Sequence, residues 1–195
     1  MRTIVYLIRH GAYENPKAIL HGRLPGFPLS AEGKQMAGRL ANYLAQKPIV
    51  AVYSSRLTRA YQTAEIIAKK FHKHVIIDRR LLDIRTPLQG KSIAYIDSIE
   101  SDFYTEDLIR AGGERLETVF VRMDRCIRSK VRVHVGKEFV VVSHGDPIMS
   151  IATRYSGKPL PRKFSYPNSY VPTASGFKIE FDAKGSPVRI AKFPA

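Results

Sequence analysis

Four short apolar runs, which do not alternate with polar residues, recur along the chain. β-branched and aromatic residues are frequent in them, so each run is predicted to be a strand buried on both faces of a sheet. The runs are residues 3–8, 49–53, 75–77 and 139–142. Near the C-terminus, apolar residues alternate with polar ones on both sides of Lys184-Gly185. This pattern predicts a terminal hairpin.

Between the strands, apolar residues recur every three or four positions, as on one face of a helix. Because strands alternate with helices, the fold is predicted to be α/β, with three layers and a mainly parallel sheet flanked by helices. The predicted helices are one that Ser30 caps and Pro48 stops, one with Ala60, Ala64, Ile67 and Phe71 on one face, one after Glu114 and one starting near Pro147.

The length of 195 residues suits one well-buried domain, so residues 1–195 are expected to form a single domain. Residues 83–113 interrupt the alternation with an irregular, weakly amphipathic stretch containing Pro87, Gly90 and Gly112-Gly113. Long irregular segments inside compact domains often cover a functional site. We therefore predict that residues 83–113 form an inserted lid.

Two of the predicted strands end in a histidine followed by a glycine. The first run leads into Arg9-His10-Gly11, and the last into His144-Gly145. A single histidine at a strand end is more often a satisfied structural residue. Ligands of open α/β sheets bind at the carboxyl ends of the strands, however, so the pair favours one shared pocket for His10 and His144.

The segment from Ser54 to Arg59 joins a strand end to a helix start, where free backbone amides attract anions. Arg59 at the positive end of a helix dipole is unfavourable unless something negative lies beside it. A solvated surface arginine is an equally good interpretation of this stretch alone. Together with Arg9, Arg59 could hold the oxygens of a phosphate.

His10 has the features of a nucleophile toward phosphorus, provided that its ring is neutral and oriented. Such a role requires one free ring nitrogen and a hydrogen bond at the other, for which the Gly11 carbonyl is a plausible acceptor. His144 would then act as a hydrogen-bond donor or a cation that stabilises negative charge on the phosphoryl oxygens.

Composition narrows the possible partners and cofactors. The net charge of +15 favours anionic partners, but no zinc-finger or RNP-type signature accompanies it, so a solvated basic surface is preferred to nucleic-acid binding. No HExxH motif or cysteine-histidine cluster is present, and His72 and His74 form the only close histidine pair, so we expect no metal and no other cofactor. The single cysteine, Cys126, falls on a predicted helix and is expected to be buried rather than reactive.

No apolar stretch is long enough to span a bilayer, and the first apolar run is too short and strand-like for a secretory signal. We therefore expect a cytoplasmic protein that does not associate with membranes.

Five segments in order resemble the histidine phosphatase superfamily, in its phosphoglycerate mutase-like branch, and the resemblance spans most of the chain. Each motif alone would be weak, but five in the family's order are specific. The segments are Leu7-Ile8-Arg9-His10-Gly11, Leu29-Ser30-Ala31-Glu32-Gly33-Lys34-Gln35, Ser54-Ser55-Arg56-Leu57-Thr58-Arg59-Ala60-Tyr61-Gln62-Thr63-Ala64, Gly112-Gly113-Glu114 and Val142-Ser143-His144-Gly145.

The resemblance implies that His10 becomes a transient phosphohistidine, which water then hydrolyses. It places Arg9, Arg59 and His144 at positions that bind the transferring phosphoryl group. Asn15 matches an asparagine that contacts phosphate in relatives.

Two positions depart from the family pattern. His21-Gly22 falls where relatives usually carry Gln-Gly, which leaves substrate contacts at His21 and Gly22 as expectations. Ala12-Tyr13 stands where relatives commonly carry Glu followed by Ser or Thr, so a possible hydroxyl contact with phosphate is missing.

The general acid has more than one candidate. Asp83, in Leu81-Leu82-Asp83-Ile84, best matches the position where this branch usually has glutamate, and it could protonate a leaving oxygen if it comes within hydrogen-bond range. Asp146 is a rival, because other branches use an acid just beyond the second histidine. Asp146 could equally cap the helix before Pro147. Glu14 is a third nearby carboxylate.

We therefore predict a metal-independent phosphomonoester hydrolase that acts through a phosphohistidine on His10. Its expected partner is a small phosphorylated substrate, with a phosphoprotein as an alternative, and the sequence gives no oligomeric state. A phosphoglycerate mutase is the first alternative, because Pro87-Leu88-Gln89-Gly90 resembles a mutase segment. A basic protein that binds phosphate or nucleic acid without catalysis is the second.

Overall fold

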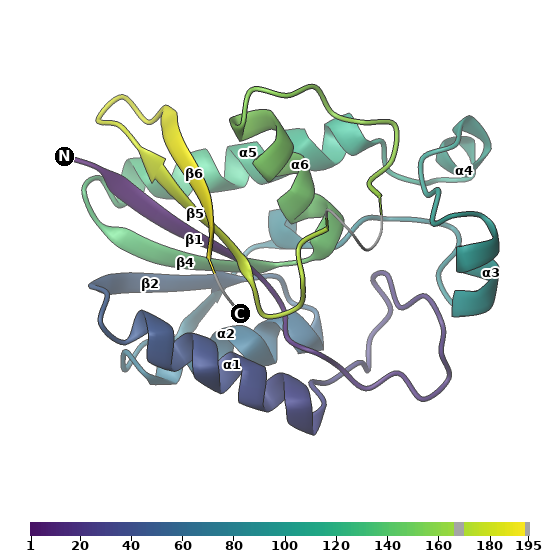
Figure 1. The fold of residues 1–195 in the computed structure, drawn as a ribbon, viewed down its shortest axis with the longest axis horizontal. Coiled ribbons are helices and arrows are strands. Elements are labelled where there is room, and N and C mark those ends of the chain that lie inside the picture. Colours follow the sequence, from purple (N-terminus) through teal and green to yellow (C-terminus); the bar gives the residue numbers. More distant parts are fainter. Residues whose placement is uncertain (166–169, 194–195) are drawn as a thin grey trace.

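A computed structural model describes residues 1–165 and 170–193 of the chain. Its centre is a six-stranded sheet flanked by helices on both faces, which confirms the predicted three-layer α/β fold (Figure 1). The strands are β1 Thr3–Arg9, β2 Ile49–Ser54, β3 Val75–Ile77, β4 Glu138–Ser143, β5 Gly176–Phe181 and β6 Pro187–Phe193.

The sheet has the strand order β3-β2-β4-β1-β5-β6. The first four of these strands run parallel, while β5 pairs antiparallel with β1 and β6 pairs antiparallel with β5. The sheet is thus mainly parallel and ends in the predicted hairpin. Because β4 lies between β1 and β2, the carboxyl ends of these three strands meet at one edge.

Two pairs of successive helices cover the two faces of the sheet. On one face lie α1, Ala31–Leu44, and α2, Thr58–Lys69; on the other lie α5, Leu116–Val133, and α6, Gly145–Tyr155 (Figure 1). Successive side chains of a strand point to opposite faces, so β1 buries Tyr6 and Ile8 beneath the first pair and Val5 and Leu7 beneath the second. This two-sided burial explains why β1 is apolar without alternation.

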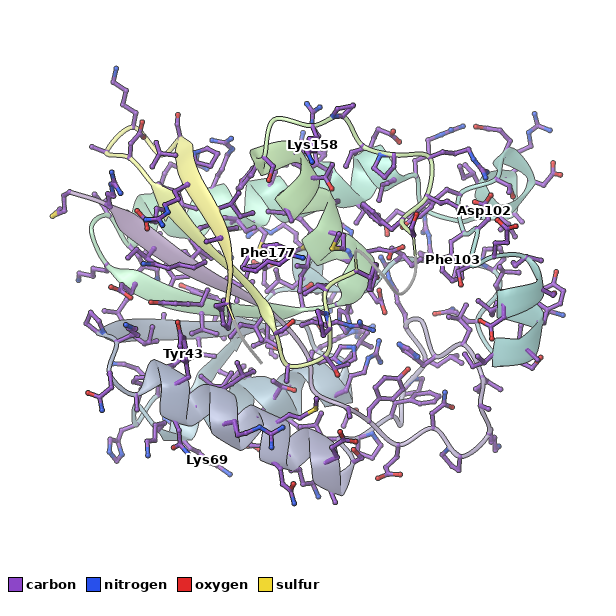
Figure 2. All side chains as sticks on the ribbon, in the orientation of Figure 1. Tyr43, Lys69, Asp102, Phe103, Lys158 and Phe177 are labelled. Atoms are coloured by element: carbon purple, nitrogen blue, oxygen red, sulfur yellow. The ribbon has the colours of Figure 1, made fainter. Side chains whose placement is uncertain are left out.

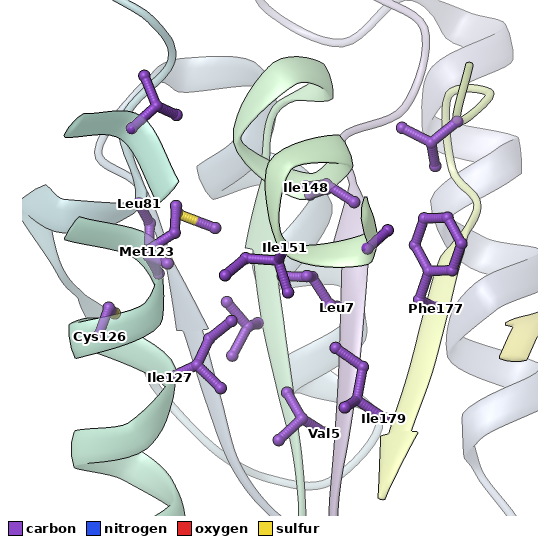
Figure 3. Close-up of a cluster of buried hydrophobic side chains, with 14 of the residues drawn as sticks. Val5, Leu7, Leu81, Met123, Cys126, Ile127, Ile148, Ile151, Phe177 and Ile179 are labelled. Carbon is purple, nitrogen blue, oxygen red and sulfur yellow. The ribbon is translucent and has the colours of Figure 1, made fainter. Parts of the chain in front are cut away.

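Figure 3 shows the core on the α5 and α6 face, where Val5 and Leu7 lie near Ile127 and Ile151. Cys126 belongs to this core and is fully buried. Burial raises the pKa of its thiol to about 12, so the expected structural role of this cysteine agrees with the structure.

The structure confirms the predicted start of α1 but ends α2 earlier than predicted. Ser30 caps α1, because its Oγ accepts a hydrogen bond from the Gly33 amide at 3.0 Å. The helix after β2 is shorter than its apolar spacing suggested: α2 ends at Lys69, two residues before Phe71.

Residues 83–113 are less irregular than their sequence suggested. They contain two short helices, α3 Ile93–Ser98 and α4 Glu106–Arg110, which follow the 3-10 turn η1 Arg79–Leu81. The segment also pairs with the loop after β1, since the Leu20 amide donates to the Lys91 carbonyl at 2.7 Å. Within the described ranges, no helix has both the length and the apolar character required to span a bilayer.

Candidate active site

The register between β1 and β4 brings the two predicted histidines together. Arg9 lies opposite Ser143 at the carboxyl ends of these parallel neighbours, so the next residues, His10 and His144, leave the sheet side by side. Their ring centroids are 5.2 Å apart. The two histidines therefore lie next to each other, as the paired strand-His-Gly pattern predicted, although His144 is not among the described residues that line the cavity beside His10.

Two hydrogen bonds fix the His10 ring and identify its tautomer. Nδ1 lies 2.8 Å from the Gly11 carbonyl oxygen, which can only accept, so Nδ1 carries the proton. Nε2 accepts a hydrogen bond from Arg59 Nε at 3.1 Å and therefore holds the lone pair. Burial, followed by the positive charges of Arg59 and Arg9, keeps the pKa of His10 well below its ordinary value. The ring is thus neutral and oriented near pH 7, as a nucleophile toward phosphorus would have to be.

His144 is completely buried and is oriented by a serine that the sequence analysis did not single out. Arg59 Nη2 lies 3.2 Å from Nδ1 and can only donate, so Nε2 carries the proton and donates to Ser55 Oγ at 2.7 Å. Burial and the charge of Arg59 keep the pKa of His144 well below its ordinary value. The structure favours a neutral His144 over the cationic form that the sequence left open. The position of Ser55 directly after β2 was the only signal for its role.

Arg59 connects the groups of the site. Although only the second residue of α2, its side chain is 1% exposed. Its Nε donates to His10, and its Nη2 lies beside His144 and donates to the Gly22 carbonyl at 2.9 Å and to Asp83 Oδ2 at 3.0 Å. The solvated alternative is therefore wrong for Arg59, whereas its neighbour Arg56 is exposed. Asp83 supplies the negative charge that a cation at a helix start requires.

One buried side-chain nitrogen of Arg9 has no hydrogen-bond acceptor among the described residues. Its Nη1 donates to the Val171 carbonyl at 2.7 Å, and its guanidinium lies 5.2 Å from the centroid of the Tyr170 ring. Its Nε is buried and has no hydrogen-bond partner among the described residues. Such a group normally has an acceptor, so it is suited to an anionic ligand.

Asp83 is held through both its carboxylate and its backbone. Oδ1 accepts from the Ile84 amide at 2.9 Å, which leaves Oδ2 facing Arg59. The Asp83 carbonyl accepts from Arg23 Nε at 2.7 Å and from Arg122 Nη2 at 3.0 Å. Both arginines also bind the buried carboxylate of Glu114, at 2.8 and 2.7 Å. Glu114 of the Gly112-Gly113-Glu114 motif thus holds the backbone of the candidate acid through Arg23 and Arg122.

The two departures from the family pattern contact one another. The hydroxyl of Tyr13 lies 2.8 Å from His21 Nδ1, and His21 Nε2 lies 3.7 Å from Asp83 Oδ2. Gly22 adopts φ +44°, and its carbonyl accepts from Arg59. His21 and Gly22 therefore both reach the site, and Tyr13 joins it through His21.

Three other candidates lie elsewhere or are engaged differently. The Asn15 amide group binds the backbone of Ile19, and Asn15 is not among the described residues lining the cavity. Glu14 is exposed and does not line the cavity either. Asp146 lines it, but its carboxylate accepts from the hydroxyls of Tyr104 and Tyr170. The helix-cap interpretation of Asp146 is wrong, because α6 begins at Gly145 with His144 as its N-cap.

A small cavity opens above His10. Among the described residues, its wall combines Arg9, His10, His21, Gly22, Asp83 and Asp146 with the apolar or aromatic residues Leu20, Ile84, Phe103 and Tyr170. Phe103, labelled in Figure 2, comes from the segment between α3 and α4. Within residues 1–165 and 170–193, no group of three or more His, Cys, Asp or Glu is arranged to hold a metal ion.

Comparisons with known proteins agree with this geometry. The family model of the histidine phosphatase superfamily, branch 1, matches residues 5–191. An uncharacterized protein of Mycobacterium tuberculosis is 36% identical over 164 residues, covering 81% of each chain. Phosphoglycerate mutase-like protein 4 of Arabidopsis thaliana is 34% identical over 173 residues, covering 82% of this chain and 73% of the relative.

Among solved structures, YhfR of Bacillus stearothermophilus superimposes with a TM-score of 0.81 at 29% identity, over 95% of this chain and 94% of that one. The family match covers nearly the whole chain and includes every strand of the site. The chain therefore belongs to the histidine phosphatase superfamily, branch 1, whose typical chemistry is phosphoryl transfer through a phosphohistidine.

Proposed function

We propose that this protein is a phosphomonoester hydrolase that forms its phosphoenzyme on His10 Nε2. The observation that carries the proposal is the neutral His10 ring, whose Nδ1 proton is bound by the Gly11 carbonyl and whose Nε2 lone pair meets Arg59. A nucleophile with this arrangement needs no further base to activate it.

In the first step, Nε2 of His10 attacks phosphorus, the N–P bond forms, and the bond from phosphorus to the ester oxygen breaks. The unused Nε of Arg9 and the guanidinium of Arg59 neutralise the phosphoryl oxygens. His144 can donate from Nδ1 after a tautomer change, because the Ser55 hydroxyl can then donate to its Nε2. These contacts stabilise charge where it develops.

Asp83 is the proposed general acid. In its protonated form it gives its proton to the departing ester oxygen, and in the second step it accepts a proton from the water that attacks phosphorus. The N–P bond then breaks, inorganic phosphate leaves, and His10 regains its lone pair. Support for Asp83 comes from its Oδ2, which faces Arg59 and lies 3.7 Å from His144 Nδ1. Asp146 is less suited, since two tyrosine hydroxyls already bind its carboxylate.

The cavity wall favours hydrolysis of a small monoester over interconversion of phosphoglycerates. A phosphoglycerate carries a carboxylate that needs a cation of its own beside the phosphate site. Arg9 is the one lysine or arginine among the described residues that line the cavity, and residues 166–169 contain neither residue type. The proposed substrate class is therefore a monoester whose leaving group is uncharged and packs on Leu20, Ile84 and Phe103.

We also propose that the chain acts as one domain in which residues 83–113 cover the site. Ile84, Thr86 and Phe103 of this segment line the cavity, and its Ser92 bridges to Ile19 of the loop after β1. This arrangement places one wall of the cavity on a segment outside the sheet.

A substrate panel with acid-quench labelling tests the function. The parent should release inorganic phosphate from small uncharged monoesters and carry an acid-labile phosphoryl label, and His10→Ala should lose both while keeping its circular dichroism spectrum. Isomerised phosphoglycerate as the main product would overturn hydrolysis in favour of a mutase. Salt-sensitive polyanion binding that survives His10→Ala, in a parent without turnover or label, would indicate a non-enzymatic binding protein.

A further inference from the structure

His21 and Tyr13, two neighbouring residues of the site, contact each other. The Tyr13 hydroxyl lies 2.8 Å from His21 Nδ1. The rings also pack edge to face, with centroids 4.6 Å apart, and Phe27 packs against His21 with a centroid distance of 5.7 Å. The His21 ring is thus held on two sides, and its Nε2 lies 3.7 Å from Asp83 Oδ2.

Both members of the pair are neutral near pH 7. Burial and the positive charges of Arg59 and Arg9 lower the pKa of His21 to about 3. Burial raises the pKa of Tyr13, so its hydroxyl keeps its proton. When this hydroxyl donates to Nδ1, the remaining ring proton is on Nε2, which faces the Asp83 carboxylate.

The surroundings of Asp83 give His21 a distinct task. Oδ1 is fixed by the Ile84 amide, whereas Oδ2 faces three groups: Arg59 Nη2 at 3.0 Å, His21 Nε2 at 3.7 Å and His144 Nδ1 at 3.7 Å. Arg23 and Arg122 bind the Asp83 backbone carbonyl, and Glu114 pairs with both of them, so none of these three supplies a donor to Oδ2.

Phosphoryl oxygens bound beside His10 compete with Asp83 for Arg59 and His144. His21 does not enter this competition in the same way, because Tyr13 already occupies its Nδ1. Its Nε2 therefore stays available to Asp83 Oδ2. The distance of 3.7 Å is about 0.7 Å longer than a typical N–H···O hydrogen bond, so a small rotation of Asp83 closes it.

We infer that His21, oriented by the Tyr13 hydroxyl, is a positioning residue that aims Asp83 Oδ2 at the leaving oxygen. The inference rests on the proposed function and deepens it. His21 contributes to the step in which the ester oxygen needs a proton, and contributes little where the leaving group departs as a stable anion.

Two aromatic substrates of similar size separate this role from simple packing. The leaving group of benzyl phosphate is a strongly basic alkoxide unless it is protonated as it departs. The leaving group of 4-nitrophenyl phosphate is 4-nitrophenolate, which departs as a stable anion. In His21→Ala, the ratio of kcat/KM for benzyl phosphate to that for 4-nitrophenyl phosphate should fall about 10- to 100-fold. His21→Gln, which keeps a side-chain N–H donor, should restore most of the ratio.

Tyr13→Phe keeps the ring over Arg59 but removes the hydroxyl, so its ratio should fall between those of the parent and His21→Ala. His74→Ala, which replaces an exposed histidine, is the control and should keep the parent ratio. Both substrates are measured on one sample, so a change in the folded fraction cancels. An equal loss on the two substrates would overturn the positioning role.

Acid-quench labelling of the parent distinguishes the two levels of failure. If the parent turns over and carries the label while His21→Ala keeps the parent ratio, the role of His21 is refuted and the phosphohistidine mechanism stands. If the parent neither turns over nor carries the label, the proposed function fails and the role of His21 fails with it.

Discussion

Three buried neutral histidines should make the folded protein unusually sensitive to mild acid. His10, His21 and His144 all have pKa values far below the ordinary value of 6.5, chiefly because burial disfavours their charged forms. In the unfolded chain each ring takes up a proton as the pH falls through about 6.5. The unfolded state then binds more protons than the folded state, so the free energy of unfolding must decrease as the pH falls.

The size of this decrease in the free energy of unfolding depends mainly on the unfolded chain, because the folded rings stay neutral throughout the range from pH 7.5 to pH 5. Each such histidine then costs about 2 kcal/mol of stability between these pH values, and three cost about 6 kcal/mol. Burial also lowers the pKa of His134, which adds in the same direction. A loss of this size is comparable to the whole stability of many domains, about 5–15 kcal/mol.

Urea unfolding in phosphate-free buffers at several pH values between 7.5 and 5 measures this loss. The range lies above the ordinary pKa values of Asp and Glu, so carboxylates contribute little to it. His10→Gln and His21→Gln should each reduce the loss by about 2 kcal/mol, because each removes one titrating ring. His74→Ala, which changes an exposed ring, should follow the parent. A parent stability that stays constant across the range, or a His10→Gln variant with the parent slope, would refute the reasoning.

Other substitutions test individual contacts. Asp83→Asn should lower kcat/KM for benzyl phosphate about 100- to 10,000-fold and affect 4-nitrophenyl phosphate much less; the same selective loss in Asp146→Asn alone would reverse the assignment of the acid. Ser55→Ala removes the hydroxyl that accepts from the second histidine, and should cost about 1–3 kcal/mol of stability in urea unfolding together with part of the turnover; unchanged values would contradict that role. Gly145→Ala would bring a Cβ within 1.9 Å of the Tyr170 hydroxyl, so it should cost about 1–3 kcal/mol, and an unaltered melting curve would count against that contact.

The layers of the fold could be predicted because their signals are local. A strand such as β1, with Val5 and Leu7 packed on one face and Tyr6 and Ile8 on the other, must be apolar throughout. The spacing within α5 and the capping by Ser30 are likewise set by residues a few positions apart. Two predicted parallel strands that each end in His-Gly indicated that the two histidines meet at one edge of the sheet.

The contacts that tune the site could not be predicted, because they join residues far apart in the chain. Ser55 orients His144 across 89 positions, and Arg23 reaches Glu114 across 91. The identity of a serine or an arginine does not reveal such a partner. Asp146 shows the same limit, since its sequence position fits a helix cap, while its carboxylate binds tyrosine hydroxyls in the tertiary structure.

By itself, the sequence determined the order of the strands and of the four longer helices, the family and the two histidines, because burial periodicity and short motifs are properties of neighbouring residues. Only the tertiary structure decided the protonation of His10, the partners of Arg59 and the approach of His21 to Asp83. Those properties depend on desolvation and on hydrogen bonds between distant segments, which exist only after the segments have packed together.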